Sequence, residues 1–240
     1  MKNKNEIKTQ TVSPSRLINF VNSRLYKLPG IRRIVMNQFH SLFYYSDDLL
    51  TWKNTYWHNV RVLKCPFDLW VYQEIVCELK PNMIIESGTY QGGSALFLAT
   101  VCASLNKGRV ITIDNTIYSN RPQHERIEYL LGSSTSLEVV ETIRSRIRKD
   151  DRVMVILDAD HHKEHVLNEL RLYSEFVTIG SYMIVEDSNI NGHPVLPGYG
   201  PGPMEAIDGF LVENDCFSID RSREKFYLTF NPKGYLIKLR

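Results

Sequence analysis

The chain has 240 residues and a formal net charge of +2 at pH 7, with 43% hydrophobic and 23% charged residues. This length and composition suit one large α/β domain, and a charge so close to zero argues against nucleic acid or an anionic membrane surface as a partner. The sequence contains no run of about 18 apolar residues that could span a membrane, and its N-terminus lacks the apolar core of a secretion signal. We therefore expect a soluble, cytoplasmic protein.

Residues 1–64 are expected to precede the main domain. One helix is predicted to begin at Pro14 and a second to run through Ile31, because apolar residues follow at helical spacing. An aromatic-rich stretch then extends from Phe43 to Trp57. This stretch could pack against the domain, form part of a substrate wall or make a contact between subunits, so a homo-oligomer is compatible with the sequence.

The stretch from Met83 to Ser94 sets the fold of the rest of the chain. A short apolar run leads into a glycine-rich turn, and a helix with one apolar face follows from Gly92. This order is typical of the first unit of a nucleotide-binding α/β fold, where the helix N-terminus and the uncovered backbone of the turn contact a polar cofactor. An ordinary tight turn between a strand and a helix is the alternative.

The spacing within this turn, Glu-x-Gly-x-x-x-Gly-Gly, departs from the dinucleotide pattern G-x-G-x-x-G. An acidic residue at the strand end and wider glycine spacing suit a cofactor without a pyrophosphate. S-adenosylmethionine, which carries a cationic amine, is the obvious candidate. The predicted cofactor contacts in this turn are Glu86, Gly88, Thr89, Tyr90, Gly92, Gly93 and Ser94.

Strands and helices alternate along the rest of the chain. A capping box of Thr135 and Glu138 predicts the start of one helix. The other predicted elements are helices from Pro66, at 163–173 and from Met204, and strands at 109–114, 127–131, 152–158, 181–186, 216–219, 225–230 and 235–239. This alternation predicts that residues 65–240 form a Rossmann-like, doubly wound, mostly parallel sheet with an antiparallel C-terminal edge.

Acidic residues recur where the predicted parallel strands end. Asp114 ends the second of these strands, where an acid is placed to hydrogen-bond a nucleoside ribose; an acidic turn residue is the alternative. The other strand-end acids are Glu86, Asp158, Glu186 and Asp187. All of these carboxylates share one rim of the sheet.

Carboxylates packed closely on such a rim repel one another unless a cation joins them. Asp158, Glu186 and Asp187 belong to consecutive strands, and hard oxygen ligands of this kind suit Mg²⁺. These three residues are therefore the predicted metal ligands. A solvated acidic rim is the alternative.

Three histidines and a lysine follow Asp158. His161 lies three residues beyond it and could act as a general base, with Asp158 as its catalytic neighbour, and His162 and Lys163 compete for that role. Asp160 is either an alternative ligand or the N-cap of the helix that follows. Surface histidines at the start of a helix are the other interpretation.

Taken together, these motifs resemble the cephalosporin hydroxylase/rhamnosyl O-methyltransferase family over about residues 40–240. The likeness rests on the Glu-Ser-Gly-Thr-Tyr-Gln-Gly-Gly-Ser turn, Leu157-Asp158 followed by histidines, Val185-Glu186-Asp187, and the stretch from His193 to Glu205. It implies a class I S-adenosylmethionine-dependent methyltransferase fold and a metal bound by Asp158, Glu186 and Asp187, as in the wider group that includes catechol O-methyltransferase. That enzyme uses a lysine as base where this chain has His161, and it follows its second metal aspartate with asparagine where this chain has Ser188.

The sequence and the resemblance together lead to the hypothesis of a Mg²⁺-dependent O-methyltransferase that acts on a hydroxyl of a sugar or a glycosylated metabolite. The turn at 86–94 would hold the methionine end of S-adenosylmethionine, and the loop at 191–203 would cover the acceptor as a lid. The remaining predicted cofactor contacts are Asp114 for the ribose and Ser133 and Ser134 for the adenine side. A nicotinamide oxidoreductase and a non-catalytic carbohydrate-binding protein with a vestigial site are the rival hypotheses.

Overall fold

The computed structural model describes residues 14–46 and 51–240. Contacts within the chain divide it after Phe39 into two compact units, 1–39 and 40–240. The predicted domain boundary between residues 64 and 65 stays a prediction. Within the described residues, we find no helix with the length and apolar character that crossing a bilayer requires.

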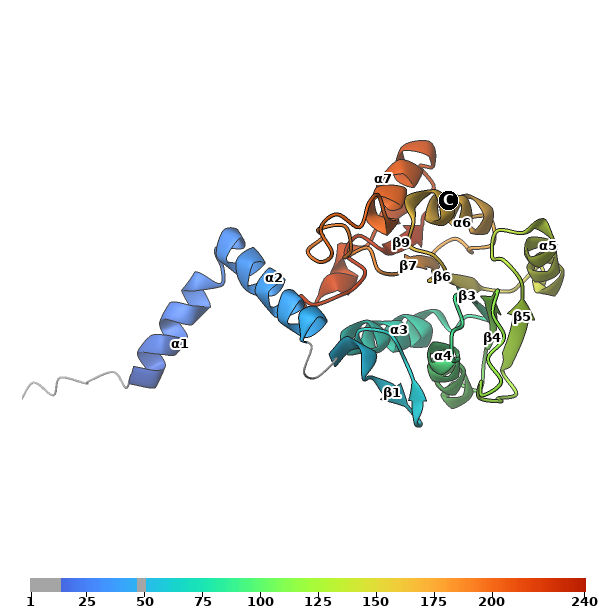
Figure 1. The fold of residues 1–240 in the computed structure, drawn as a ribbon, viewed down its shortest axis with the longest axis horizontal. Coiled ribbons are helices and arrows are strands. Elements are labelled where there is room, and N and C mark those ends of the chain that lie inside the picture. Colours follow the sequence, from blue (N-terminus) through green and yellow to red (C-terminus); the bar gives the residue numbers. More distant parts are fainter. Residues whose placement is uncertain (1–13, 47–50) are drawn as a thin grey trace, which may run out of the picture. The chain divides into compact units, whose positions relative to one another are not determined.

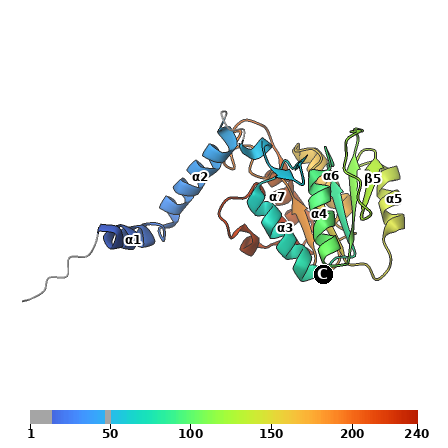
Figure 2. The ribbon, with the colours of Figure 1, turned by 90° about the horizontal axis from the view of Figure 1, so that it is seen from below.

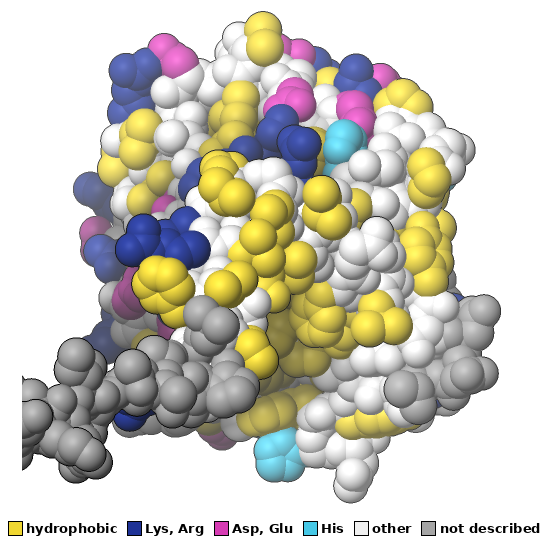
Figure 3. All heavy atoms as spheres, turned by 90° about the vertical axis from the view of Figure 1, so that its left-hand side faces the viewer, with side chains coloured by type: hydrophobic (Ala, Val, Ile, Leu, Met, Phe, Trp, Pro, Cys, Tyr) yellow, Lys and Arg dark blue, Asp and Glu magenta, His cyan; other side chains and the backbone are white. Residues whose placement is uncertain are grey.

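Two helices occupy the N-terminal part of the described chain, as predicted. They are α1, Pro14–Leu25, and α2, Pro29–Tyr45, which extends past the division between the units. Their exposed apolar side chains include Ile18, Phe20, Val21, Leu25, Ile34, Val35 and Phe39. On the face drawn in Figure 3, hydrophobic side chains gather in patches with Lys and Arg side chains beside them. The apolar residues of α1 and α2 thus lie largely at the surface rather than in a core.

The second unit is built on a seven-stranded sheet with the order β5-β4-β3-β6-β7-β9-β8. The strands are β3 (Met83–Ser87), β4 (Arg109–Asp114), β5 (Ile127–Leu131), β6 (Val153–Leu157), β7 (Tyr182–Val185), β8 (Phe217–Ile219) and β9 (Tyr235–Lys238). The pairs among β3 to β7 are parallel, whereas β9 pairs antiparallel with both β7 and β8. The predicted mostly parallel sheet with an antiparallel C-terminal edge is confirmed.

Helices cover both faces of this sheet (Figures 1 and 2). Successive side chains of a strand point to opposite faces, so Ile84 packs with α3 and α4 whereas Ile85 packs with α5, α6 and α7. The helices are α3 (Pro66–Leu79), α4 (Gly93–Ser104), α5 (Leu137–Arg146), α6 (Lys163–Tyr173) and α7 (Pro203–Glu213). The two apolar layers leave the carboxyl ends of β3 to β7 as the rim on which the predicted site residues lie.

Short elements complete the unit. An antiparallel hairpin of β1 (Tyr56–Trp57) and β2 (Val60–Arg61) precedes α3, and single 3₁₀ turns occupy η1 (Thr51–Lys53) and η2 (Arg221–Glu224). The Trp57 ring of the hairpin packs edge-on against Phe97 of α4. Part of the aromatic-rich stretch therefore serves plain packing.

The strand predicted at 225–230 is wrong, because this segment forms turns and irregular structure. A buried carboxylate on α3 explains the difference: Asp68 accepts hydrogen bonds from the Thr229 hydroxyl, the Phe230 backbone N–H and the Tyr235 hydroxyl. Thr229 and Phe230 are thus held by a helix rather than by pairing with a strand.

The capping box predicted at Thr135 is also wrong. Ser136 is the N-cap of α5, and its hydroxyl accepts a hydrogen bond from the backbone N–H of Val139. The helix begins one residue later than the pattern indicated, which is the usual uncertainty of helix ends.

Candidate active site

A cavity of about 630 Å³ opens at the carboxyl ends of the parallel strands. This volume falls within the usual range for small-molecule and cofactor sites. Eight of the predicted site residues line it: Gly88, Tyr90, Asp114, Ser133, Ser134, Asp158, His161 and Asp187. The turns after β3, β4, β5, β6 and β7 therefore contribute to one chamber, as expected for ligands of an open α/β sheet.

One end of the cavity, which we call the cofactor end, is organised by Asp114 at the end of β4. Its carboxylate accepts hydrogen bonds from the backbone N–H of Tyr90 (2.7 Å) and of Thr116 (2.8 Å). The guanidinium of Arg121 lies 3.0 Å from the same carboxylate. Backbone groups of neighbouring turns thus fix the orientation of Asp114 in the cavity wall.

Gly88 allows the turn after β3 to reach the end of β6. Its φ is +86°, and a Cβ at this position would lie 1.9 Å from the backbone oxygen of Asp158. Only glycine fits so close a backbone approach. Gly88 therefore joins the cofactor end to the carboxylate rim.

Gly93 has a packing role that was not predicted. A Cβ there would lie 2.1 Å from the backbone oxygen of Arg61, so this glycine lets the β1–β2 hairpin pack onto the start of α4. It does not line the cavity, and neither do the predicted cofactor contacts Glu86, Thr89, Gly92 and Ser94. Their direct contact with a cofactor stays a prediction.

Glu86 is fully buried behind the glycine-rich turn. Thr112 donates a hydrogen bond to its Oε2 (2.8 Å), and Thr89 lies 2.7 Å from the Thr112 hydroxyl. Burial raises the pKa of Glu86 to about 7, against the opposing charge of Lys64. Within the described part of the chain, Glu86 Oε1 has no hydrogen-bond partner, so one oxygen of this buried carboxyl group is left unsatisfied.

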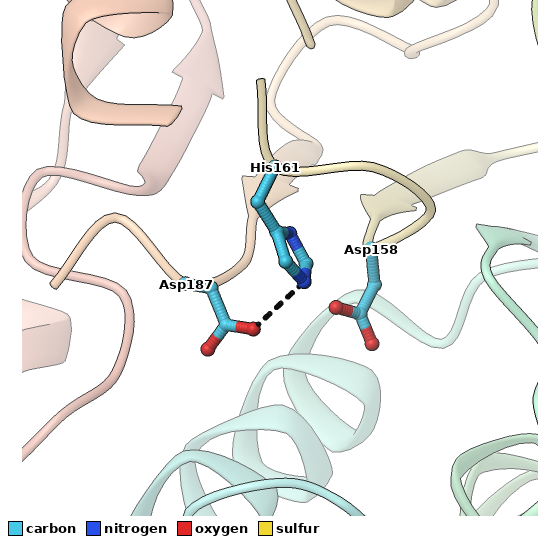
Figure 4. A group of neighbouring side chains, drawn as sticks. All are labelled: Asp158, His161 and Asp187. Carbon is cyan, nitrogen blue, oxygen red and sulfur yellow. Dashed lines mark ion pairs between the residues drawn. The ribbon is translucent and has the colours of Figure 1, made fainter. Parts of the chain in front are cut away.

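The other end of the cavity, the metal end, contains Asp158, His161 and Asp187. One potential ligand atom of each lies within 4.8 Å of the others, and His161 Nε2 is 3.1 Å from Asp187 Oδ2 (Figure 4). Asp187 has a left-handed backbone with φ of 53°, an uncommon conformation for a residue with a side chain. The two turns after β6 and β7 therefore aim two carboxylates and an imidazole at one point.

The charges at the metal end shift one another's protonation. Burial lowers the pKa of His161, but the carboxylates of Asp187 and Asp158 outweigh that effect and raise it overall. Burial raises the pKa of Asp158 and of Asp187, against the opposing charges of Lys64 and His161. Asp158 and Asp187 lie too close together for both to stay ionised without a counter-charge. A bound cation would supply that charge and stabilise both carboxylates.

Glu186, the third predicted metal ligand, faces a different set of partners. It is buried, and its Oε1 accepts hydrogen bonds from Lys64 Nζ (2.7 Å) and from the Tyr72 hydroxyl. Among the described residues, the compact cluster of potential ligand atoms does not include Glu186. Its role as a ligand stays a prediction.

Three residues that support the metal end were missed from the sequence: Lys64, Tyr72 and Asn231. Asn231 donates to the Tyr72 hydroxyl (2.7 Å) and accepts from the backbone N–H of Asp187 (3.1 Å). The one available signal was Lys64 itself, a single charge within the apolar run Val-Leu-Lys-Cys-Pro. A charge in such a run points to a buried ion pair.

With this geometry in view, comparisons with known proteins identify the family. A family model described as rhamnosyl O-methyltransferase/CmcI matches residues 50–239. The chain belongs to this family. The family resemblance found in the sequence and the predicted enzyme class, an O-methyltransferase, are confirmed, and the membership favours this class over the nicotinamide oxidoreductase.

Relatives in mycobacteria resemble the chain over nearly its whole length. It is 37% identical to rhamnosyl O-methyltransferase of Mycobacterium tuberculosis (strain ATCC 25618 / H37Rv) over 238 residues, covering 95% of this chain and 94% of that protein. The M. leprae (strain TN) protein of the same name is 37% identical over 85% of this chain and 90% of its own length.

Two solved structures share the fold. A structure of CmcI described as its Mg–SAM form aligns with a TM-score of 0.62 and 23% identity, covering 78% of each chain. The O-methyltransferase TomG from Streptomyces achromogenes, in complex with SAM, aligns with a TM-score of 0.53 and 14% identity, covering 85% of this chain and 90% of its own. These likenesses establish the methyltransferase fold of the family member described here.

The alternatives considered for the base lie outside the chamber. His162 is the N-cap of α6, its side chain is 73% exposed, and its Nδ1 is 2.7 Å from Asp160 Oδ1. Neither His162 nor Lys163 lines the cavity, whereas His161 does. Asp160 is not the N-cap of α6, which corrects that prediction: its carboxylate closes a turn by accepting from the backbone N–H of His162.

His165, which was not predicted, also lines the cavity and lies 3.2 Å from the Ser134 hydroxyl.

Aromatic side chains line another part of the cavity. Tyr44 and Trp52 stack with ring centroids 5.3 Å apart and planes 7° from parallel, and Phe230 meets Tyr44 edge-on. Leu196 and Tyr199 contribute from the loop at 191–203. Part of the aromatic-rich stretch therefore forms a wall of the chamber, one of the roles considered for it.

Proposed function

We propose that this family member transfers the methyl group of S-adenosylmethionine to a hydroxyl of a sugar or glycosylated acceptor, assisted by Mg²⁺. The observation that carries the proposal is one cavity that is lined both by five of the ten predicted cofactor contacts and by the Asp158–His161–Asp187 cluster. The five are Gly88, Tyr90, Asp114, Ser133 and Ser134. The mycobacterial relatives, named as rhamnosyl O-methyltransferases, support a sugar acceptor. The CmcI structures named with Mg–SAM and with SAH support the choice of cofactor and ion.

The donor set at the metal end fits Mg²⁺. Mg²⁺ is usually held by one or two carboxylates and keeps its other positions for water or substrate oxygens. Asp158 and Asp187 supply two carboxylates that are partly exposed to the cavity. Bound there, the ion would supply Lewis-acid chemistry that makes a hydroxyl more acidic.

The residues of the chain would hold the reactants and move the proton. Asp114 would hold the ribose, Ser133 and Ser134 the adenine side, and the turn at 86–94 the methionine end. His161 would accept the hydroxyl proton as the general base, and Asp187, whose Oδ2 lies 3.1 Å from His161 Nε2, would stabilise the resulting imidazolium. S-adenosylmethionine, when bound, would supply the methyl group: the acceptor oxygen would gain it as the bond from methyl to sulfur breaks, which would leave the sulfur as a neutral thioether.

The aromatic wall and the loop at 191–203 would position the acceptor. Flat rings such as Tyr44 and Trp52 offer apolar surface to one face of a sugar. Glu205 ties the loop down at both ends, because it accepts from Asn191 and from the backbone N–H of Gly202. A loop anchored in this way can exclude water from the reacting atoms while its centre moves.

Calorimetry with S-adenosylmethionine and S-adenosylhomocysteine, each with and without Mg²⁺, tests the cofactor. We expect micromolar binding that Asp114→Ala abolishes and that Asp150→Ala, an exposed control, retains. A panel of rhamnosides and glucosides, assayed by mass spectrometry for methyl transfer, then tests the acceptor class. Failure of the wild-type protein to bind either ligand would overturn the proposal.

A further inference from the structure

Lys64 places a buried ammonium group between two carboxylates at the metal end. Its Nζ lies 2.8 Å from Asp158 Oδ2 and 2.7 Å from Glu186 Oε1, and the side chain is 2% exposed. Its neighbours Val62 and Cys65 are buried as well, so the backbone carrying the lysine is anchored. The contact is therefore part of the interior and not a surface ion pair.

Burying the charged ammonium group of Lys64 is unfavourable unless it is closely paired with opposite charges. Four carboxylates face this region: Glu86, Asp158, Glu186 and Asp187. Among the ion pairs of the described residues, Lys64 is the one lysine or arginine that contacts any of these four. The chain thus supplies its own cation to the rim on which a divalent ion is expected.

Lys64 also selects which oxygens remain available. It engages Oδ2 of Asp158, and it engages Oε1 of Glu186 together with the Tyr72 hydroxyl. Within the described chain, Asp158 Oδ1 and Glu186 Oε2 take part in no hydrogen bond. One oxygen of each carboxylate is thus held by Lys64, and the other oxygen of Asp158, which lines the cavity, is left for a ligand.

We propose that Lys64 is a positioning residue of the metal site that acts as a built-in counter-cation, orienting Asp158 and Glu186 while limiting the affinity for a divalent ion. The choice of Mg²⁺ rests on the proposed function, but the role of Lys64 rests on its own contacts. The ammonium group of Lys64 and a divalent ion would contact the same carboxylates, and two cations held so close together repel each other. Removing the ammonium leaves two buried carboxylates for which a divalent ion is the available counter-charge.

The test measures metal binding without cofactor or acceptor. Wild type, Lys64→Met, Lys64→Gln and Lys64→Arg are stripped with EDTA and titrated with MgCl₂ and MnCl₂ by calorimetry and thermal melting. Lys233→Met is the matched control, since Lys233 contacts both oxygens of Asp208 and does not line the cavity. We expect Lys64→Met and Lys64→Gln to bind Mn²⁺ at least about tenfold more tightly than wild type, to melt earlier without the ion and to regain stability with it. Lys64→Arg, which keeps the charge, should resemble wild type.

Unchanged or weaker Mn²⁺ binding by Lys64→Met and Lys64→Gln would overturn the proposal. An equal gain in Mn²⁺ affinity in the control Lys233→Met would overturn it as well. A neutral variant that folds only with the divalent ion supports it, and one that fails to fold with or without the ion overturns it. Binding of S-adenosylmethionine, measured separately without metal, distinguishes the two proposals. Tighter metal binding by the neutral variants, without any cofactor binding, would support the role of Lys64 and contradict the proposed methyltransferase function. Cofactor binding without tighter metal binding would support the methyltransferase function and contradict the role of Lys64.

Discussion

The two ends of the cavity are built in different ways. At the cofactor end, backbone N–H groups of Tyr90 and Thr116 hold the Asp114 carboxylate, with the guanidinium of Arg121 beside it. Asp114 ends β4, and Tyr90 and Thr116 lie in the turns after the adjacent strands β3 and β4. At the metal end, side chains that are far apart in the sequence do the work: Lys64 and Tyr72 hold Glu186, and Asn231 holds the backbone of Asp187. Backbone hydrogen bonds thus hold the acid at the cofactor end, whereas a buried network of side chains holds the acids at the metal end.

This difference predicts how each end responds to substitution. A group held by backbone bonds keeps its position when a neighbouring side chain is changed. A group held by a buried polar network loses its position when one partner is removed, because the removal leaves another buried polar atom without a hydrogen bond. We therefore expect substitutions at the metal end to be costly for stability as well as for function.

The largest effect is expected for His161→Ala. Loss of a positioned general base lowers turnover by roughly 10²- to 10⁴-fold, while binding of S-adenosylhomocysteine should be nearly unchanged because His161 belongs to the metal end. His162→Ala is the matched control, since His162 is the adjacent residue but its side chain is largely exposed. Steady-state assays with both variants give the result. Equal losses of activity in both would show that the histidine run acts as a whole and that His161 is not the base.

Paired tyrosine substitutions compare the stability of the two ends. Tyr72→Phe removes a hydroxyl shared by Glu186 and Asn231, whereas Tyr173→Phe removes one that donates to the backbone oxygen of Ser134 (2.8 Å). We expect Tyr72→Phe to lower the free energy of unfolding by about 3 kcal/mol and Tyr173→Phe by about 1 kcal/mol. Urea denaturation measures both. A larger loss in Tyr173→Phe would contradict the contrast between the two ends.

The same contrast explains what the sequence could predict. Asp114, Gly88 and Asp158 were found because a strand followed by a turn places its last residues on the rim, which is a local rule. Lys64 and Asn231 are far apart in the sequence. Each reaches the metal end through another residue, Glu186 for Lys64 and Tyr72 for Asn231, and this depends on how α3 and the C-terminal segment pack against the sheet. The one sign of that packing in the sequence is the charge of Lys64 within an apolar run. The same packing also misled the prediction at 225–230, where contacts with Asp68 replaced strand pairing.

Acid should weaken the contacts that His40 makes beside the aromatic wall of the cavity. His40 is buried, stacks on Phe230 and lies 2.9 Å from the side-chain nitrogen of Asn189, and burial lowers its pKa to about 4. The unfolded chain takes up the proton near pH 6.5, so the stability contributed by neutral His40 is present above that pH and is lost as the pH falls toward 4.

The resulting loss of unfolding free energy between pH 7 and pH 5 is on the order of 2 kcal/mol. Urea denaturation across this range should show a shallower pH dependence in His40→Gln than in wild type. His124→Gln, at a partly exposed histidine that does not line the cavity, is the control for the loss of one histidine. A His40→Gln slope equal to that of wild type would mean that His40 is not the group that titrates.

The smallest effect is expected for Ser134→Ala at the cofactor end. The substitution removes a hydroxyl that lies 3.2 Å from His165 Nε2, but the backbone oxygen of residue 134 keeps its bond from Tyr173. We expect a loss of about 1 kcal/mol in unfolding free energy and a decrease in S-adenosylhomocysteine affinity of less than about tenfold. Calorimetry and urea denaturation of one preparation give both values. If Ser134→Ala costs as much as Tyr72→Phe, the cofactor end also depends on side-chain partners, and the two ends of the cavity differ in position but not in construction.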